Sequence, residues 1–259
     1  MAYREVHKGV PEGRLKIIGL GPMDCVTTEV VPSTLELTPE QLSHLPGVVE
    51  ELRARGVEVT DGPTYRLESW GVGEGLHLRL SERSYYDSVL LKRHKHWGIR
   101  SQVLAVVAVT LCPEGYLVEQ RSARVAALPG RLHPLPSGSV EPPLSPLDTL
   151  LREAEEELGL EPHELTEVMC LGLVYGEESG VYQLVGRATT EISGEELLSR
   201  ACSGAWEKDE VLFAPTNPKD LSEWLRVRRE RLTVGGRVAL VMEGGRRWGR
   251  EWLEDNLPC

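Results

Sequence analysis

The sequence predicts an α/β fold, a mixed sheet with helices on both of its faces. Val103–Leu111 is a continuous apolar run rich in β-branched residues, which is typical of a strand buried on both faces. Pro146–Leu158 has the apolar periodicity of a helix that packs on such a sheet. The other expected strands and helices follow one another without a strict βαβ repeat, which favours a mixed sheet over a purely parallel one.

Size and charge limit the classes of protein that fit. A chain of 259 residues accommodates one large domain or two modest ones. No apolar run reaches the ~18–20 residues that span a bilayer, and the polar N-terminus lacks an apolar signal core, so we expect a cytoplasmic protein without a membrane partner. The net charge of −11 argues against a nucleic-acid partner. A small phosphorylated substrate is compatible with it, because a divalent metal can reverse the local field.

The cysteines predict no disulfide framework and no zinc site. Their number is odd, they are scattered, and none has the spacing of a zinc ligand pair. We therefore interpret them as reduced, small, buried residues rather than catalytic thiols. They are Cys25, Cys112, Cys170, Cys202 and Cys259.

Residues 1–98 predict a small α+β domain. The expected elements are a strand at Leu15–Leu20, a helix from the cap Thr38 to Arg55 that ends at Gly56, a hairpin of Tyr65–Trp70 with Leu76–Leu80, and a short helix at Ser84–Arg93. The basic stretch Lys92–Trp97 follows this helix. One interpretation is a solvated helix end, where the helix dipole favours cations. The other is a wall that contacts substrate phosphates.

Residues 99–259 predict a larger domain that includes the central strand and the strong helix. Its other expected elements are the strand Tyr116–Gln120, a long loop at Ala127–Pro146, a hairpin of Val168–Tyr175 with Val181–Arg187, a strand at Val211–Ala214, and helices at Asp220–Arg231, Gly236–Met242 and Arg246–Asp255.

The helix Pro146–Leu158 has clear start and stop signals. Ser145 is a good N-cap, and Asp148 stands where a capping box needs an acidic residue. Proline suits the first helical position, and Gly159 is a natural C-terminal stop.

Three glutamates on this helix predict a metal site. Glu153, Glu156 and Glu157 share one helix face, where their charges repel one another. A divalent cation such as Mg²⁺, which prefers hard oxygen ligands, removes that repulsion. Taken alone, the cluster is equally compatible with a solvated acidic face.

The preceding loop distinguishes these interpretations. The fixed residues read Gly138-x13-Arg152-Glu153-Ala154-x-Glu156-Glu157-x-Gly159-Leu160. This pattern resembles the Nudix box, in which Gly, Arg, Glu, Glu, Glu and Gly stand at the same spacing. One fixed position differs, because Leu144 replaces the first Glu of the box.

The resemblance implies a loop–helix–loop on a Nudix α/β/α sandwich and an Mg²⁺-dependent hydrolase, with Mn²⁺ as an alternative metal. Glu153, Glu156 and Glu157 would hold the metal, with a backbone carbonyl near Ser137, and Arg152 would buttress a carboxylate or the loop. The reaction would cleave the diphosphate of a nucleoside diphosphate linked to another group. Glu141 is a candidate replacement for the glutamate missing at Leu144.

Members of the family often add an acidic residue from a later loop. The favoured candidate here is Glu207, because it precedes an expected strand; a solvated charged loop is an equally good interpretation of this segment. The other candidates are Glu177, Glu178 and Glu210.

The segment Arg121–Gly130 resembles the UDP-glucose and UDP-galactose pyrophosphatase branch of the family. That likeness implies cleavage of a UDP-sugar to UMP and a sugar 1-phosphate. Arg121 and Arg124 would then contact phosphates, and Tyr85 and Asp87 would lie at the domain junction near the nucleotide. Surface solubility or an ion pair explains either arginine equally well.

Three alternatives remain open at this point. The first is a hydrolase of another nucleotide, such as ADP-ribose or coenzyme A, and the second is a Nudix-fold sensor that binds a nucleotide without cleaving it. The third is a structural helix without metal. Trp224, Trp248 and Trp252 would form either a homodimer surface or ordinary core.

Overall fold

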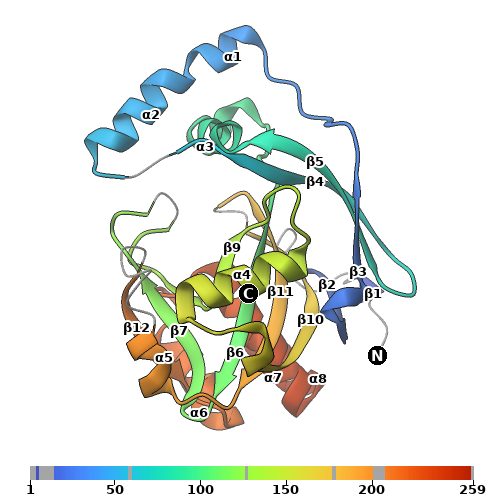
Figure 1. Cartoon of the computed structure of the whole chain (residues 1–259), viewed down its shortest axis with the longest axis vertical. Helices are drawn as coiled ribbons and strands as arrows, with labels where there is room; N and C mark the ends of the chain where they lie inside the picture. Colours follow the sequence, from blue (N-terminus) through green and yellow to red (C-terminus); the bar gives the residue numbers. More distant parts are fainter. Residues whose placement is uncertain are drawn as a thin grey trace.

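The computed structural model describes residues 4–5, 15–57, 60–125, 128–176, 179–200 and 208–257. Its strands form one sheet whose main path runs β1-β2-β10-β11-β6-β4-β5-β3. Figure 1 shows α1, α2 and α3 at one end of the molecule and the larger second part of the chain at the other, with β1 and β2 of the first part beside β10.

The sheet of the second part is mixed, as predicted. β10 (Leu165–Gly176) and β11 (Val181–Thr190) are antiparallel, whereas β11 runs parallel to β6 (Val103–Cys112). β6 is buried along almost its whole length. The remaining strands here are β7 (Gly115–Arg121), β8 (Leu132–Pro134), β9 (Ser137–Ser139) and β12 (Lys208–Ala214).

Helices cover both faces of this sheet. Val106 of β6 belongs to one apolar core with Leu150 of α4 (Pro146–Leu158), and Val107 to another with Val238 of α7 (Val234–Trp248). Neighbouring residues of one strand thus face opposite helical layers, which explains the unbroken apolar run. The other helices are α5 (Gly194–Arg200), α6 (Pro218–Val227) and α8 (Arg250–Asn256), with a 3₁₀ turn at Pro162–Glu164.

The first part of the chain extends the same sheet. The hairpin of β4 (Pro63–Val72) and β5 (Leu76–Ser84) joins β6 where Arg66 pairs with Val103. β3 (Val26–Val30) adds to β5 in parallel, and β2 (Leu15–Pro22), which pairs with β1 (Arg4–Glu5), adds to β10. Short 3₁₀ turns occur at Met23–Cys25 and Lys95–Trp97. The domain boundary after residue 98 stays a prediction.

The expected helix of the first part is in fact two helices. α1 (Pro39–Ser43) has the predicted cap at Thr38, and α2 (Leu45–Ala54) begins after a break at His44. Pro46 explains the break, because proline suits a first helical turn and not a helix interior. α3 (Tyr85–Arg93) follows β5 as predicted.

Three further expectations are corrected. The long loop at 127–146 contains the strands β8 and β9, and α5 has no counterpart among the predicted elements. The two helices expected at Gly236–Met242 and Arg246–Asp255 divide later than predicted, because α7 continues through Gly244 and Gly245 to Trp248. A Cβ at either of these glycines would overlap Trp252 or Leu253 of α8, so they allow the two helices to pack closely.

The tryptophans and cysteines fit the interior. Trp224 is buried, and Trp248 and Trp252 pack against the same apolar cluster, so the structure favours ordinary core for them. A homodimer stays a prediction. Cys112 and Cys170 are buried and Cys25 is exposed, and none of these three forms a disulfide. Cys202 and Cys259 lie outside the described residues. Within the described ranges, no helix is long and apolar enough to cross a bilayer.

Candidate active site

Helix α4 has the bounds that its sequence predicts. The Ser145 hydroxyl accepts the Asp148 N–H at 3.1 Å, and the Asp148 carboxylate accepts the Ser145 N–H at 3.3 Å, which completes the capping box. Gly159 ends the helix in the left-handed conformation, at φ 62°. Leu150, Ala154 and Leu158 are buried, so the glutamates lie away from the core.

The loop before α4 runs along the helix through β9. The Ser137 N–H donates to Glu157 Oε2 at 3.0 Å and ties the loop to the helix. A Cβ at Gly138 would overlap the carboxylate of Glu153, so only glycine leaves room for that side chain against the loop backbone. The first glycine of the box therefore has a direct steric role here.

Arg152 links the loop to two of the helix carboxylates. Its guanidinium donates to Glu153 at 2.8 Å and to Glu141 at 3.1 Å, and its Nε lies 3.8 Å from Glu156. Burial lowers the pKa of Arg152, but the bonds to Glu153 and Glu141 outweigh it and raise that pKa above its usual value. Leu144 supplies no carboxylate, and Glu141 supplies one to Arg152 instead.

The three helix carboxylates do not converge on one point. Glu157 is held by Ser137, Glu153 is held by Arg152, and the Glu156 side chain is 62% exposed. Over the described ranges, no group of three or more His, Cys, Asp or Glu is placed to hold a metal ion. The donors nevertheless suit a hard cation, because the carboxylates of Glu153 and Glu156 line the same cavity as the loop residues Ser137 and Gly138.

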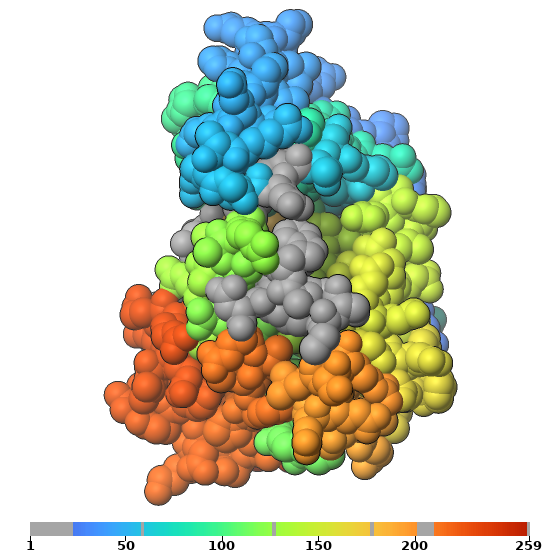
Figure 2. All heavy atoms as spheres, turned by 60° about the vertical axis from the view of Figure 1, so that its left-hand side comes forward, coloured from blue at the N-terminus to red at the C-terminus, as the bar shows by residue number. Residues whose placement is uncertain are grey.

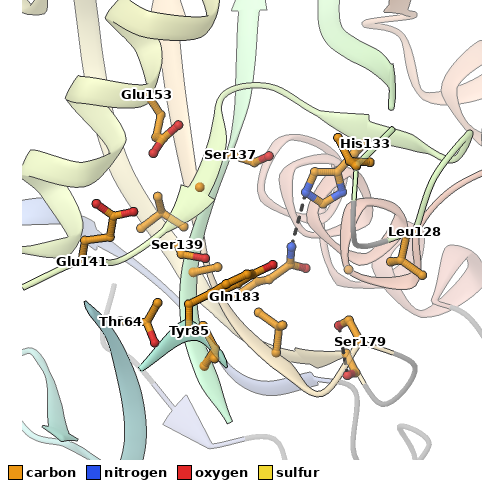
Figure 3. Close-up of a pocket in the computed structure, with 18 of the residues that line it drawn as sticks. Thr64, Tyr85, Leu128, His133, Ser137, Ser139, Glu141, Glu153, Ser179 and Gln183 are labelled. Atoms are coloured by element: carbon orange, nitrogen blue, oxygen red, sulfur yellow. Dashed lines mark hydrogen bonds between the residues drawn. The ribbon is translucent and has the colours of Figure 1, made fainter. Parts of the chain in front are cut away.

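A cavity of about 700 Å³ opens beside α4 and is lined by both parts of the chain. Glu141, Glu153 and Glu156 line one side. Figure 3 shows Glu153 and Glu141 on that side, Gln183 near the middle, and His133, Leu128 and Ser179 opposite. In Figure 2 the first part of the chain, in blue and cyan, sits above the green to orange remainder. From the first part come Thr60, Asp61, Gly62, Pro63, Thr64, Tyr85 and Lys92.

The far side of the cavity has a neutral hydrogen-bonding group. The buried His133 bonds through Nδ1 to the Thr233 hydroxyl at 2.6 Å, and its Nε2 lies 3.3 Å from the Gln183 amide nitrogen. Burial, together with the charge of Arg121, lowers the pKa of His133 to about 3. His133 is therefore uncharged near neutral pH and fixes the orientation of Gln183.

Two of the predicted substrate-binding residues line the cavity. They are Tyr85, on α3, and Arg121, whose guanidinium donates to the buried Glu119 at 3.1 Å. Asp87 does not line it, because its carboxylate pairs with Arg83 at 2.6 Å. Arg124 is exposed and does not line it either.

Of the four candidate acids in the later loops, the structure describes one. Glu207, Glu177 and Glu178 lie outside the described residues. Glu210 is described and is exposed on β12, away from the cavity lining.

Three residues that line the cavity were not among the predicted site residues: Lys92, His133 and Gln183. Lys92 belonged to a stretch with two open interpretations, and His133 lay in a segment predicted as loop. Gln183 carried a usable signal, because it is a polar residue between the apolar pairs Val181–Tyr182 and Leu184–Val185.

Comparisons with known proteins agree with the box. The family model described as NUDIX domain matches residues 101–232. No curated protein sequence matches the chain.

The chain is similar over part of its length to several solved structures of low identity. DR0079 of Deinococcus radiodurans is 20% identical, covering 59% of this chain and 86% of its own, with a TM-score of 0.41. A bifunctional NMN adenylyltransferase/ADP ribose pyrophosphatase of Francisella tularensis is 15% identical, covering 63% and 48%, with a TM-score of 0.40. An Ap4A hydrolase of C. elegans is 15% identical, covering 56% and 97%, with a TM-score of 0.35.

The family model spans half of the chain and contains the loop, the helix and the central strands described above. Nudix hydrolases typically act on nucleoside diphosphate derivatives and generally use a divalent metal. The chain belongs to the Nudix family and is a pyrophosphohydrolase.

Proposed function

We propose that this protein hydrolyses a UDP-sugar to UMP and a sugar 1-phosphate with Mg²⁺. One observation carries the proposal: the carboxylates of α4 open onto the same cavity as Arg121 and Tyr85. These are two of the four residues chosen for their likeness to the UDP-sugar branch. The volume of about 700 Å³ lies within the range of small-molecule sites, ~300–1,000 Å³.

Glu153 and Glu156, with the Ser137 carbonyl, are the groups that would hold the cation. A bound cation would neutralise the negative charge that develops on the phosphate and lower the pKa of a water molecule. Glu157 keeps the loop in place by accepting the Ser137 N–H. Arg152 orients Glu153 through their 2.8 Å bond, and Glu141 in turn orients Arg152.

Arg121 would contact the diphosphate. Its planar guanidinium can form two parallel hydrogen bonds to phosphate oxygens. The buried Glu119 holds one edge of the guanidinium and so limits its rotation. At the far side, Gln183 is fixed by the neutral His133 and offers amide hydrogen bonds to an uncharged group of the substrate.

The direct test is a substrate panel at fixed Mg²⁺. It contains UDP-glucose, UDP-galactose, ADP-ribose, NADH, coenzyme A and a dinucleoside polyphosphate, and the products are separated and quantified. We expect UMP and sugar 1-phosphate in equal amounts from the UDP-sugars. Turnover of another member without turnover of either UDP-sugar would contradict the assignment of substrate. The double variant Glu156→Gln/Glu157→Gln serves as the control for contaminating hydrolases.

A further inference from the structure

Lys92 is a cation of the cavity wall that pairs with no carboxylate among the described residues. It stands on the last turn of α3, is partly buried, and lines the cavity that contains Glu153. The described part of the chain places no carboxylate in ion-pair contact with its amine. The amine nitrogen lies 6.0 Å from the centroid of the Tyr85 ring. A charge removed from water without a partner is costly.

The groups around Lys92 add to this cost. Arg121 of β7 and Lys95 both repel it electrostatically, and Arg121 lines the same cavity from the other part of the chain. Asp61 also lines the cavity, but its carboxylate accepts the Ser84 hydroxyl at 2.6 Å and the Tyr86 N–H at 3.2 Å. His133 contributes no charge near neutral pH.

Burial, followed by the charges of Arg121 and Lys95, lowers the pKa of Lys92 to about 8. The amine is therefore mostly protonated at neutral pH. Two like charges from separate parts of the chain then face one cavity in a protein of net charge −11.

A solvated helix end does not explain this position. The neighbouring Arg93 fits that interpretation, because it is exposed and pairs with Glu51 of α2. Lys92 instead lines the cavity, and no described carboxylate pairs with it. The basic stretch thus divides into a surface cation and a cavity cation.

We propose that Lys92 and Arg121 together bind a phosphate of the substrate, so that α3 completes the active site of the Nudix domain. The negative charge of a diphosphate would lie between the two cations and balance the charge of both. The inference rests on the proposed function only in requiring a diphosphate, and not in the identity of the base or sugar.

The first experiment compares Lys92→Met with Lys95→Met, its matched control in the same stretch. For Lys92→Met we expect KM to rise at least 10-fold, while the melting temperature at pH 7 stays equal or increases because an unpaired charge is removed. Lys95→Met should leave KM within about 2-fold. A lower melting temperature together with an unchanged KM would mean a structural role and would overturn the proposal.

The second experiment follows the Lys92 amine itself by NMR of protein labelled with ¹³C at lysine Cε. The chain contains few lysines, so Lys92→Met assigns the signal. In the free protein the amine should titrate near pH 8, and inorganic pyrophosphate with Ca²⁺ should raise this pKa by at least 1 unit. An unchanged pKa overturns the proposal for Lys92.

These outcomes separate the two proposals. If pyrophosphate raises the pKa of Lys92 but no UDP-sugar is cleaved, the phosphate site stands and the substrate assignment fails. If UDP-sugars are cleaved equally well by Lys92→Met, the substrate assignment stands and the role of Lys92 fails.

Discussion

Helices α4 and α7 pack on opposite faces of one sheet, and on each of them glutamate pairs with arginine. On α7, Glu243 is fully buried. Its carboxylate accepts from Arg246 at 2.7 and 2.9 Å and from Arg187 at 3.2 Å, and the Tyr116 hydroxyl lies at 3.5 Å. One carboxylate there has two cations and no access to the cavity.

On α4, carboxylates outnumber the arginine that contacts them. Arg152 contacts two of the three box carboxylates, Glu153 and Glu156, and also pairs with Glu141 of the loop. Glu153 and Glu156 line the cavity. A saturated carboxylate contributes to structure, because its charge is already balanced. An incompletely balanced set that faces a cavity retains the capacity to bind a cation. The difference between α4 and α7 therefore lies in counterions and access rather than in residue type.

The largest expected effect comes from the α4 carboxylates. Glu156→Gln/Glu157→Gln should lower kcat/KM by about 10³-fold or more, since a catalytic metal contributes several kcal/mol of transition-state stabilisation. The melting temperature without metal should not fall, because two crowded like charges are removed. Steady-state kinetics and thermal unfolding of the same preparation measure both. Activity within 10-fold of the parent would show that α4 is not the metal helix.

Glu243→Gln should have the opposite profile. Arg187, which is mostly buried, then keeps the ion pair with the partly exposed Glu167 and loses the one with Glu243. The free energy of unfolding should fall by about 3 kcal/mol. Denaturant unfolding measures this loss, and kcat of the folded enzyme should be unchanged. The control is Glu254→Gln at the exposed Arg250 pair, where the expected loss is below about 1 kcal/mol. An equal loss of unfolding free energy in both variants would contradict the structural role assigned to Glu243.

Gly138→Ala tests the close approach of the loop backbone to Glu153 of α4 without removing a charge. The new methyl group must displace the Glu153 carboxylate, and we expect kcat to fall about 10- to 100-fold because small misplacements at a reacting centre are costly. Stability should change little, since a flexible side-chain end can move aside. Gly71→Ala is the control, because a Cβ there meets nothing within 4 Å. An unaffected kcat in Gly138→Ala would remove the steric argument for this glycine.

The smallest effect is expected at the start of α4. Ser145→Ala removes the capping hydroxyl and should cost about 1 kcal/mol of unfolding free energy, with little change in KM. Ser43→Ala removes an exposed hydroxyl that donates to the Glu40 carbonyl and should cost a few tenths of a kcal/mol. Urea titrations resolve the two, and a larger loss at Ser43 would count against the role of the cap.

Much of α4 could be predicted because its determinants are local. The cap at Ser145, the stop at Gly159 and the spacing of the glutamates lie within one turn or a few turns of one another. Local hydrogen bonds and helical periodicity act over that range. The strands β6, β10 and β11 were likewise predicted from their own apolar patterns.

The contacts between distant residues could not be predicted in this way. Glu141 reaches Arg152, α8 packs on the glycines of α7, and Lys92 meets the cavity of a helix some sixty positions later. The pattern of α3 was compatible with a solvated end as well as with a cavity wall. The sequence by itself determined the main strands of the sheet and the helix α4, because these depend on neighbouring residues. Only the tertiary structure decided which charges are balanced, because burial and counterions depend on how remote segments pack.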